Sequence, residues 1–173
     1  TNRGHANKIA DAISSSRNTD AKQICALLQK CFPLHPISAS LVGHAAKRAY
    51  GQNQRSIFSF LNSAENFGFQ HFLNRASYPD LYEPSAFWDY LKYNLENSII
   101  LSGDSSRWQV ARDAILRAES TFKDGKLIEL TKSIAIIDLF RELSGIPANI
   151  STLSTLKIFE KETELMSALQ SLE

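Results

Sequence analysis

The four histidines are the residues of this sequence best suited to bind a metal ion or to act as general acids and bases. They are His5, His35, His44 and His71. Metal sites usually place two histidines three to five residues apart, so that both rings reach one ion. No two of the four have that spacing, and His35 and His44 lie on either side of an expected helix start. The sequence therefore predicts no metal site.

Other patterns associated with catalysis are also missing from the sequence. It contains no GxxxxGK[ST] or GxGxxG loop to hold phosphate groups, and no GxSxG segment to activate a serine. Asp80, Glu83 and Asp89 lie close together in sequence, where helix caps and surface ion pairs explain acidic side chains. We therefore predict no catalytic residue in this chain and no cofactor bound by it.

The two cysteines indicate whether the protein resides in a reducing or an oxidising compartment. Cys25 and Cys31 are six residues apart in one predicted helix, which places them on different faces, so they cannot form a local disulfide. Two unpaired thiols favour a reducing compartment. No apolar run approaches the roughly 20 residues of a membrane span, and the first residues lack the apolar core of a signal peptide. We expect a cytoplasmic protein with no membrane partner.

Charge is unevenly distributed along the chain. The formal net charge is only +1, yet residues 1–55 hold eight Lys and Arg against two Asp, a net of +6. The remaining residues therefore carry −5. A basic front end can contact phosphates or an acidic partner, and it can equally be a solvated helical face. Both interpretations stay open.

Apolar residues recur every three or four positions along almost the whole chain, which is typical of amphipathic helices. No stretch alternates strictly over the length of a strand. The sequence therefore predicts an all-α fold, a multi-helix orthogonal bundle. The expected helices cover residues 5–15, a second helix that is capped by Thr19 or Asp20 and reaches Cys31, 36–50 with Gly51 as the stop, 54–61, 68–73, a helix capped by Ser85 and another capped by Asp104 or Ser105.

The segment 127–143 differs because it is apolar on nearly every side, as expected of a central helix. We predict that Leu130, Ile134 and Ile137 are almost fully buried there. Gly145, followed by a proline, is expected to end this helix.

The last residues resemble a helix-turn-helix in outline. Ser151 is expected to cap a helix over STLSTLKIF, and a turn leads into KETELMSALQSLE. We interpret 1–125 as a lid-like helical bundle and 126–173 as an incomplete winged-helix-like unit packed on it. Residues 151–173 hold two Lys and four Glu, a net of −2, which would repel a phosphate backbone. Nucleic-acid binding through this unit is therefore not expected.

Two stretches together indicate a family. Residues 31–61, CFPLHPISASLVGHAAKRAYGQNQRSIFSFL, join a PLHP turn to a helix and then to QNQRSIFSFL. This combination resembles a signature of large prokaryotic P-loop ATPases, many from phage-defence and mobile-element operons. FWDYLKYNLENS and LTKSIAIIDLF resemble segments that follow in the same proteins, so the resemblance covers roughly residues 30–173.

The resemblance implies a position in a larger enzyme. The nucleotide-binding core of such ATPases precedes this region, so the chain would be the helical lid and the start of the winged helix. Lids of this kind place a turn proline against adenine and can supply an arginine to phosphate, which implies that Pro33, His35, Pro36 and Arg55 lie near the nucleotide. Pro36 is equally explained as the first residue of a helix, and Arg55 as a structural arginine.

Three functions follow from these observations. The preferred one is a non-catalytic regulatory module of a multidomain P-loop ATPase, with ATP bound by the parent protein and not by this chain alone. The expected partners are other domains of the same polypeptide, or further copies in a homo-oligomer. The alternatives are a stand-alone helical protein–protein interaction domain and, with least support, a transcription regulator.

Overall fold

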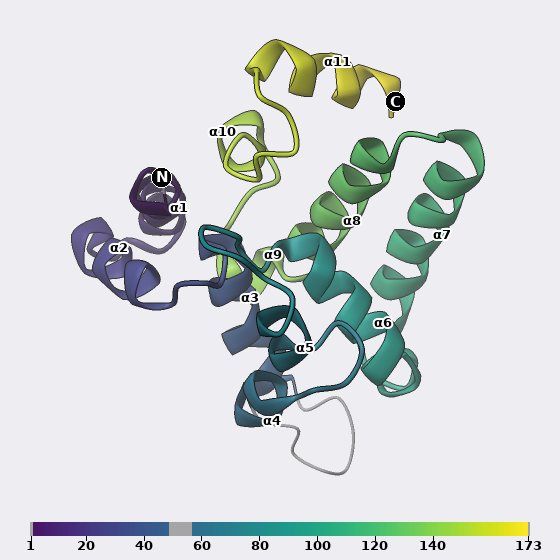
Figure 1. The fold of residues 1–173 in the computed structure, drawn as a ribbon, viewed down its shortest axis with the longest axis horizontal. Helices are drawn as coiled ribbons and strands as arrows, with labels where there is room; N and C mark the ends of the chain where they lie inside the picture. Colours follow the sequence, from purple (N-terminus) through teal and green to yellow (C-terminus); the bar gives the residue numbers. More distant parts are fainter. Residues whose placement is uncertain (1, 49–56, 173) are drawn as a thin grey trace.

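The chain folds as a bundle of helices (Figure 1). The computed structural model describes residues 2–48 and 57–172, and the part it describes contains helices joined by turns, with one isolated bridge between Leu34 and Tyr82. The helices are α1 (Asn2–Arg17), α2 (Ala21–Lys30), α3 (Pro36–Lys47), α4 (Ile57–Asn62), α5 (Phe69–Leu73), α6 (Pro84–Ile100), α7 (Ser105–Thr121), α8 (Gly125–Leu139), α9 (Arg141–Ser144), α10 (Ile150–Leu153) and α11 (Glu162–Ser171). The predicted all-α fold is confirmed.

Several helices begin where side chains bind the free backbone N–H groups of the first turn. Asp20 caps α2 by accepting from the Lys22 N–H, as the sequence predicts. Asp124 caps α8 in the same way through the Lys126 N–H. At α3, Pro36 occupies the first turn and needs no N–H partner there.

Two predicted caps are wrong by two residues each. Helix α6 begins at Pro84, so Glu83 is its N-cap residue and Ser85 lies inside the first turn. Proline tolerates that position because its missing N–H would be unpaired anyway. Helix α10 begins at Ile150 and is capped by Asn149, whose side chain accepts from the Thr152 N–H. An asparagine cap is as favourable as a serine cap, and here it precedes the predicted Ser151.

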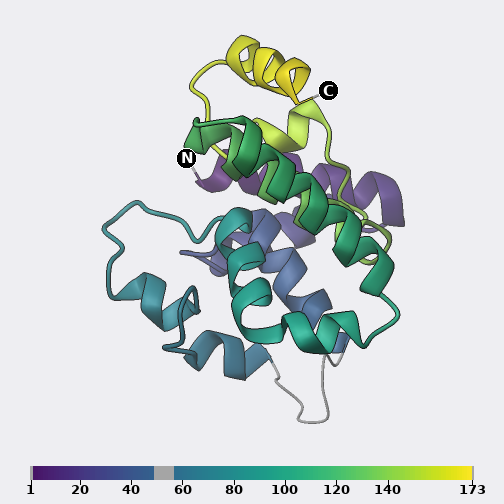
Figure 2. The same ribbon diagram turned by 90° about the vertical axis from the view of Figure 1, so that its right-hand side faces the viewer.

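The main core lies between α6, α7 and α8, which pack together on one side of the molecule (Figures 1 and 2). At its centre the indole rings of Trp88 and Trp108 stack, with centroids 4.2 Å apart and planes 17° from parallel. Both side chains are buried. Helices α1 and α2 form a hairpin that packs on α3. The two tryptophans thus join the second turn of α6 to the first turn of α7.

A second part of the core consists of aromatic rings. Phe60 of α4 contacts Tyr82, Phe87 and Tyr90 edge-on, with centroid distances between 5.0 and 5.5 Å. Edge-to-face contacts of this kind add about 0.5–1.5 kcal/mol each beyond the burial of apolar area. The rings join α4 to α6.

The predicted central helix is interrupted. Helix α8 ends at Leu139, Phe140 adopts a non-helical conformation (φ −105°, ψ 8°), and the short helix α9 follows. Gly145 ends α9 with φ 73°, a left-handed conformation that glycine adopts without strain, as predicted. Leu130 and Ile137 are fully buried as predicted.

Ile134 is the exception in this segment, because it is only partly buried. It lines a shallow, mostly apolar groove between α7 and α8 together with Val110, whose side chain is 69% exposed. Helix α8 packs against α6 and α7, so one strip of its surface faces neither neighbour. The prediction of near-complete burial is wrong for this residue.

We expect the difference in burial to be visible in stability. Leu130→Ala should lower the free energy of unfolding by about 2–5 kcal/mol, because a buried cavity forms. Ile134→Ala should cost about 1 kcal/mol, because solvent replaces the lost methylene groups. Urea denaturation of both variants measures this. Equal losses would show that the groove is closed in solution.

Two further expectations concern the chain as a whole. Among the described residues, no helix is long and apolar enough to cross a membrane. The division at residue 125 stays a prediction, and α8, which follows it, packs on α6 and α7 of the preceding part. Helices α10 and α11 follow one another with a connection between them, and the winged-helix relationship also stays a prediction.

Candidate functional site

The PLHP turn is joined to the chain before α6 by backbone hydrogen bonds. The Tyr82 N–H donates to the Pro33 carbonyl at 2.8 Å, and the His35 N–H donates to the Tyr82 carbonyl at 3.1 Å. Leu34 lies between these bonds and pairs with Tyr82 as a parallel bridge. The turn is therefore part of a small fixed junction and not a free loop.

The His35 side chain is fully buried and uses both ring nitrogens. Nδ1 accepts a hydrogen bond from the Ile37 N–H at 3.2 Å, which caps α3. Nε2 lies 3.0 Å from the carbonyl oxygen of Thr155, a residue 120 positions further on. Because Nδ1 accepts and a carbonyl cannot donate, Nε2 carries the proton. The pre-proline backbone is extended (φ −59°, ψ 142°), as predicted.

A second histidine and a lysine lie beside this ring. The ring centroids of His5 and His35 are 5.6 Å apart, and Nδ1 of His5 is buried without a hydrogen bond partner among the described residues. Burial is the main cause that lowers the pKa of each ring to about 4, and the charge of Lys157 lowers both further. Both imidazoles are therefore neutral at pH 7.

Glu83 lies beside this junction, and its pKa is raised, whereas the pKa values of the two histidines are lowered. Burial, reinforced by the charge of Glu129, raises the pKa of Glu83 to about 9, so this carboxyl is protonated at pH 7. Its Oε2 atom is buried and has no hydrogen bond partner among the described residues. Glu129 accepts a hydrogen bond from the Ser85 hydroxyl at 3.4 Å. The junction thus contains titratable groups whose neutral forms are favoured.

The structure brings together three of the four residues that the family resemblance places near a nucleotide. Pro33 is partly exposed, whereas His35 and Pro36 are buried. Because both nitrogens of His35 are bonded within the chain, a ligand at this turn would meet the Pro33 side of it. Arg55 lies outside the described residues. The roles of all four stay predictions.

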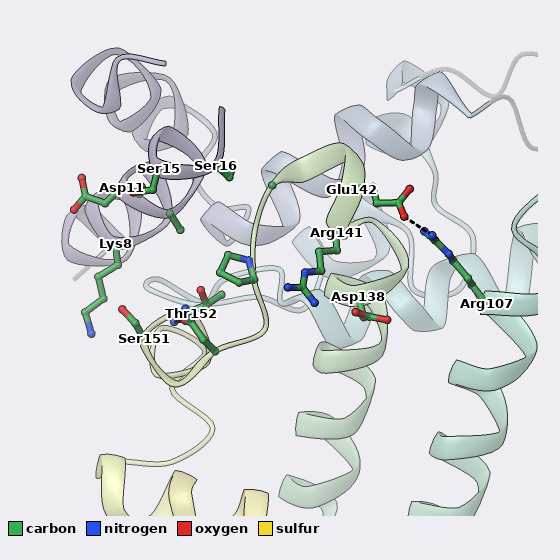
Figure 3. Close-up of a pocket in the computed structure, with 14 residues that line it drawn as sticks. Lys8, Asp11, Ser15, Ser16, Arg107, Asp138, Arg141, Glu142, Ser151 and Thr152 are labelled. Atoms are coloured by element: carbon green, nitrogen blue, oxygen red, sulfur yellow. Dashed lines mark hydrogen bonds and ion pairs between the residues drawn. The ribbon is translucent and has the colours of Figure 1, made fainter. Parts of the chain in front are cut away.

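A polar groove runs between α1 and the α8–α10 region (Figure 3). It has a volume of about 900 Å³ and is lined by Lys8, Asp11, Ala12, Ser15, Ser16, Arg107, Asp138, Arg141, Glu142, Gly145, Pro147, Asn149, Ser151 and Thr152. Figure 3 shows α1 along one wall and the ends of α8 and α9 along the other. The residues come from segments about a hundred positions apart, so sequence patterns gave no signal for the groove.

Among the described residues, three of the six charged side chains that line this groove have a polar partner, and Arg17 bonds to the chain beside it. Arg107 and Glu142 form an exposed salt bridge at one end. The Lys8 ammonium donates to the Ser154 hydroxyl at 3.0 Å. Arg17 donates to the backbone carbonyls of Glu142 and Leu143 at the end of α9. These contacts connect α1 to α9 and to the residue that follows α10.

Among the described residues that line the groove, Arg141 is the cation without a side-chain partner. Its guanidinium extends between the two walls in Figure 3 and has no hydrogen bond or ion pair with the described residues. The lining contains three basic and three acidic side chains, so the charges balance. Such a surface is suited to polar contacts with another protein segment.

Within the described residues, no group of three or more His, Cys, Asp or Glu side chains is placed to hold a metal ion. Comparisons of the chain with models of protein families, with curated proteins and with solved structures gave no match.

Proposed function

We propose that this chain is a non-catalytic helical module of a larger multidomain P-loop ATPase in the cytoplasm, where it transmits the nucleotide state to neighbouring domains. The sequence supports this through the PLHP and QNQRSIFSFL segments and the missing phosphate-binding loop. The nucleotide is held by other domains of the parent protein, and the module meets it through the PLHP turn.

The observation that carries the proposal is the position of the PLHP turn. It is bonded to Tyr82 in front of α6 and, through His35, to Thr155 behind α10. These contacts connect three parts of the chain that are distant in sequence. A displacement of the turn must therefore move the segment before α6 and the region around α10, or break the bonds.

Breaking these bonds in place is costly. Leaving the buried Nε2–H of His35 without an acceptor costs about 1–3 kcal/mol, and the Thr155 carbonyl would lose its donor too. A rigid shift keeps the bonds and avoids this cost. The turn is thus suited to pass a change at the nucleotide on to α10 and α11.

Hydrogen exchange of the whole parent protein tests the proposal. We expect amide protection in α10 and α11 to differ between the ATP-bound and ADP-bound protein. His35→Ala should remove that difference, because the bond to Thr155 is lost. His71→Gln on α5 is the matched control and should keep it. Identical exchange in both nucleotide states, or failure of the whole protein to bind ATP, would contradict the proposal.

The groove of Figure 3 favours a second candidate, a stand-alone helical protein–protein interaction domain. Its polar walls and the unpaired Arg141 suit a protein partner. The gene's complete reading frame separates the two candidates: a GxxxxGK[ST] loop upstream of this chain supports the ATPase module, and its absence supports the interaction domain.

A further inference from the structure

Two large aromatic side chains beside the PLHP turn are exposed to solvent. Phe32 immediately precedes Pro33 and is 43% exposed, and Tyr78 is 88% exposed. Their ring centroids are 6.0 Å apart and the planes are inclined by 55°. The two rings come from the α2–α3 connection and the α5–α6 connection, which the bridge between Leu34 and Tyr82 holds side by side.

Cations flank both rings in the chain. Lys30 lies two residues before Phe32, and Arg75 lies three residues before Tyr78. Both cations are exposed and have no ion pair with the described residues. Asp80, the nearest acid to Tyr78 in sequence, accepts a hydrogen bond from the Ser77 N–H at 2.8 Å. The segments that carry the two rings thus hold two unpaired cations, with Asp80 as the acid between Tyr78 and the bridge.

We propose that Phe32 and Tyr78 form a stacking platform for the base of the nucleotide that the parent protein binds. Exposed aromatic faces on segments that also carry exposed cations fit a ligand that is flat, aromatic and anionic at once, which describes a purine nucleotide. This inference rests on the proposed function and adds the residues that touch the base. It also moves the contact from the buried His35 and Pro36 to the exposed side of the turn.

Stacking makes two demands that these residues meet. A ring must present an open face, and most of the Tyr78 side chain is open to solvent. Stacking on an aromatic side chain accepts any base, because every base has a π face, so the platform should bind ATP and GTP with similar strength. Specificity for one base would have to come from other domains.

Binding of ATPγS and of inorganic tripolyphosphate to the whole parent protein, measured by calorimetry, tests the platform. Phe32→Ala and Tyr78→Ala should each weaken ATPγS binding about 5- to 100-fold. Both should leave tripolyphosphate binding unchanged, since it has no base. Tyr93→Ala is the matched control. Tyr93 lies on α6, its side chain is 66% exposed, and its ring centroid is 5.0 Å from that of Phe67. It should leave both affinities unchanged.

Cys31 supplies a second readout that does not depend on a substitution. It is exposed and adjoins Phe32, whereas Cys25 is buried. Saturating ATPγS should slow iodoacetamide labelling of Cys31 at least several-fold, read by mass spectrometry of its peptide. The labelling rate with tripolyphosphate should equal that without ligand.

The outcomes separate the two proposals. If the whole protein binds no ATPγS, the proposed function fails, and the platform fails with it. If it binds ATPγS while both alanine variants keep full affinity and Cys31 stays unprotected, the platform alone is overturned. Loss of binding to a ten-residue oligothymidine in the same variants, with nucleotide affinity unchanged, would also overturn it in favour of single-stranded nucleic acid.

Discussion

Trp108→Ala is expected to lower the free energy of unfolding by about 3–5 kcal/mol, the upper range for a single core substitution. The Trp108 side chain is fully buried, and its ring stacks on Trp88 with a centroid distance of 4.2 Å. Its Nε1–H donates to a carboxylate oxygen of Glu96 at 3.1 Å. Alanine would leave a large cavity between α6 and α7 and remove the donor to Glu96.

Urea denaturation followed by circular dichroism measures this loss. Trp108→Phe is the informative comparison, because it keeps an aromatic ring on Trp88 and loses only part of the volume and the Nε1–H donor. Its cost should fall well below that of alanine. Tyr93→Ala, an exposed aromatic truncation on the same helix as Trp88, should change stability by less than about 1 kcal/mol. A cost below 1 kcal/mol for Trp108→Ala would show that the stacked pair is not formed in solution.

The helices could be predicted because their evidence is local. The periodicity of apolar residues around Trp108 and Ile115 gives the buried face of α7 without knowledge of its neighbours. The exact helix starts could not be predicted as well. At α10, Asn149 has the same cap chemistry as the predicted Ser151 and accepts the Thr152 N–H. At α6 no side chain caps the helix, and the fixed φ of Pro84 sets the start.

The burial of α8 shows where local evidence ends. One helix contains the large aliphatic residues Leu130, Ile134 and Ile137, and the sequence gives no reason to expect that their side chains differ in burial. Only the packing partners distinguish them: Leu130 and Ile137 are covered, whereas Ile134 faces the groove beside Val110. The number of neighbours around a helix is a property of the fold, not of its own sequence.

The candidate site could be predicted even less. The hydrogen bond between His35 and Thr155 joins residues 120 positions apart, and no periodicity or spacing in the sequence predicts it. The exposed ring of Tyr78 carried no pattern that separated it from the turn residues around it. The family resemblance points to the PLHP turn, which stays a prediction, and the burial of His35 and Pro36 leaves the Pro33 side of that turn open to a ligand.

The buried His35 should also make stability depend on pH. Its pKa in the folded protein is lowered to about 4, chiefly by burial, against about 6.5 for an unfolded histidine. Between these values the unfolded chain binds a proton that the folded chain does not, so stability falls as the pH falls from 6.5 to 4. The shift corresponds to about 3 kcal/mol for this ring. The partly exposed His5 acts in the same direction.

Glu83 acts in the opposite direction, so the His35 effect must be isolated by difference. Its pKa, raised to about 9, favours the folded protein at low pH and is the same in both proteins to be compared. His35→Gln keeps a donor that can reach the Thr155 carbonyl and cannot titrate. Guanidinium denaturation of the natural protein and of this variant, at intervals from pH 7 to pH 4, gives the difference curve.

We expect the variant to be less stable at pH 7, because the Ile37 N–H loses its Nδ1 acceptor. The stability difference should then shrink, and reverse, by about 3 kcal/mol in total on going to pH 4, because only the natural protein incurs the cost of a buried, unprotonated imidazole there. Adding His5→Gln should remove a further, smaller part of the dependence. A difference curve that stays flat from pH 7 to pH 4 would show that the His35 ring is solvated, and that its bond to Thr155 does not hold the PLHP turn to the region behind α10.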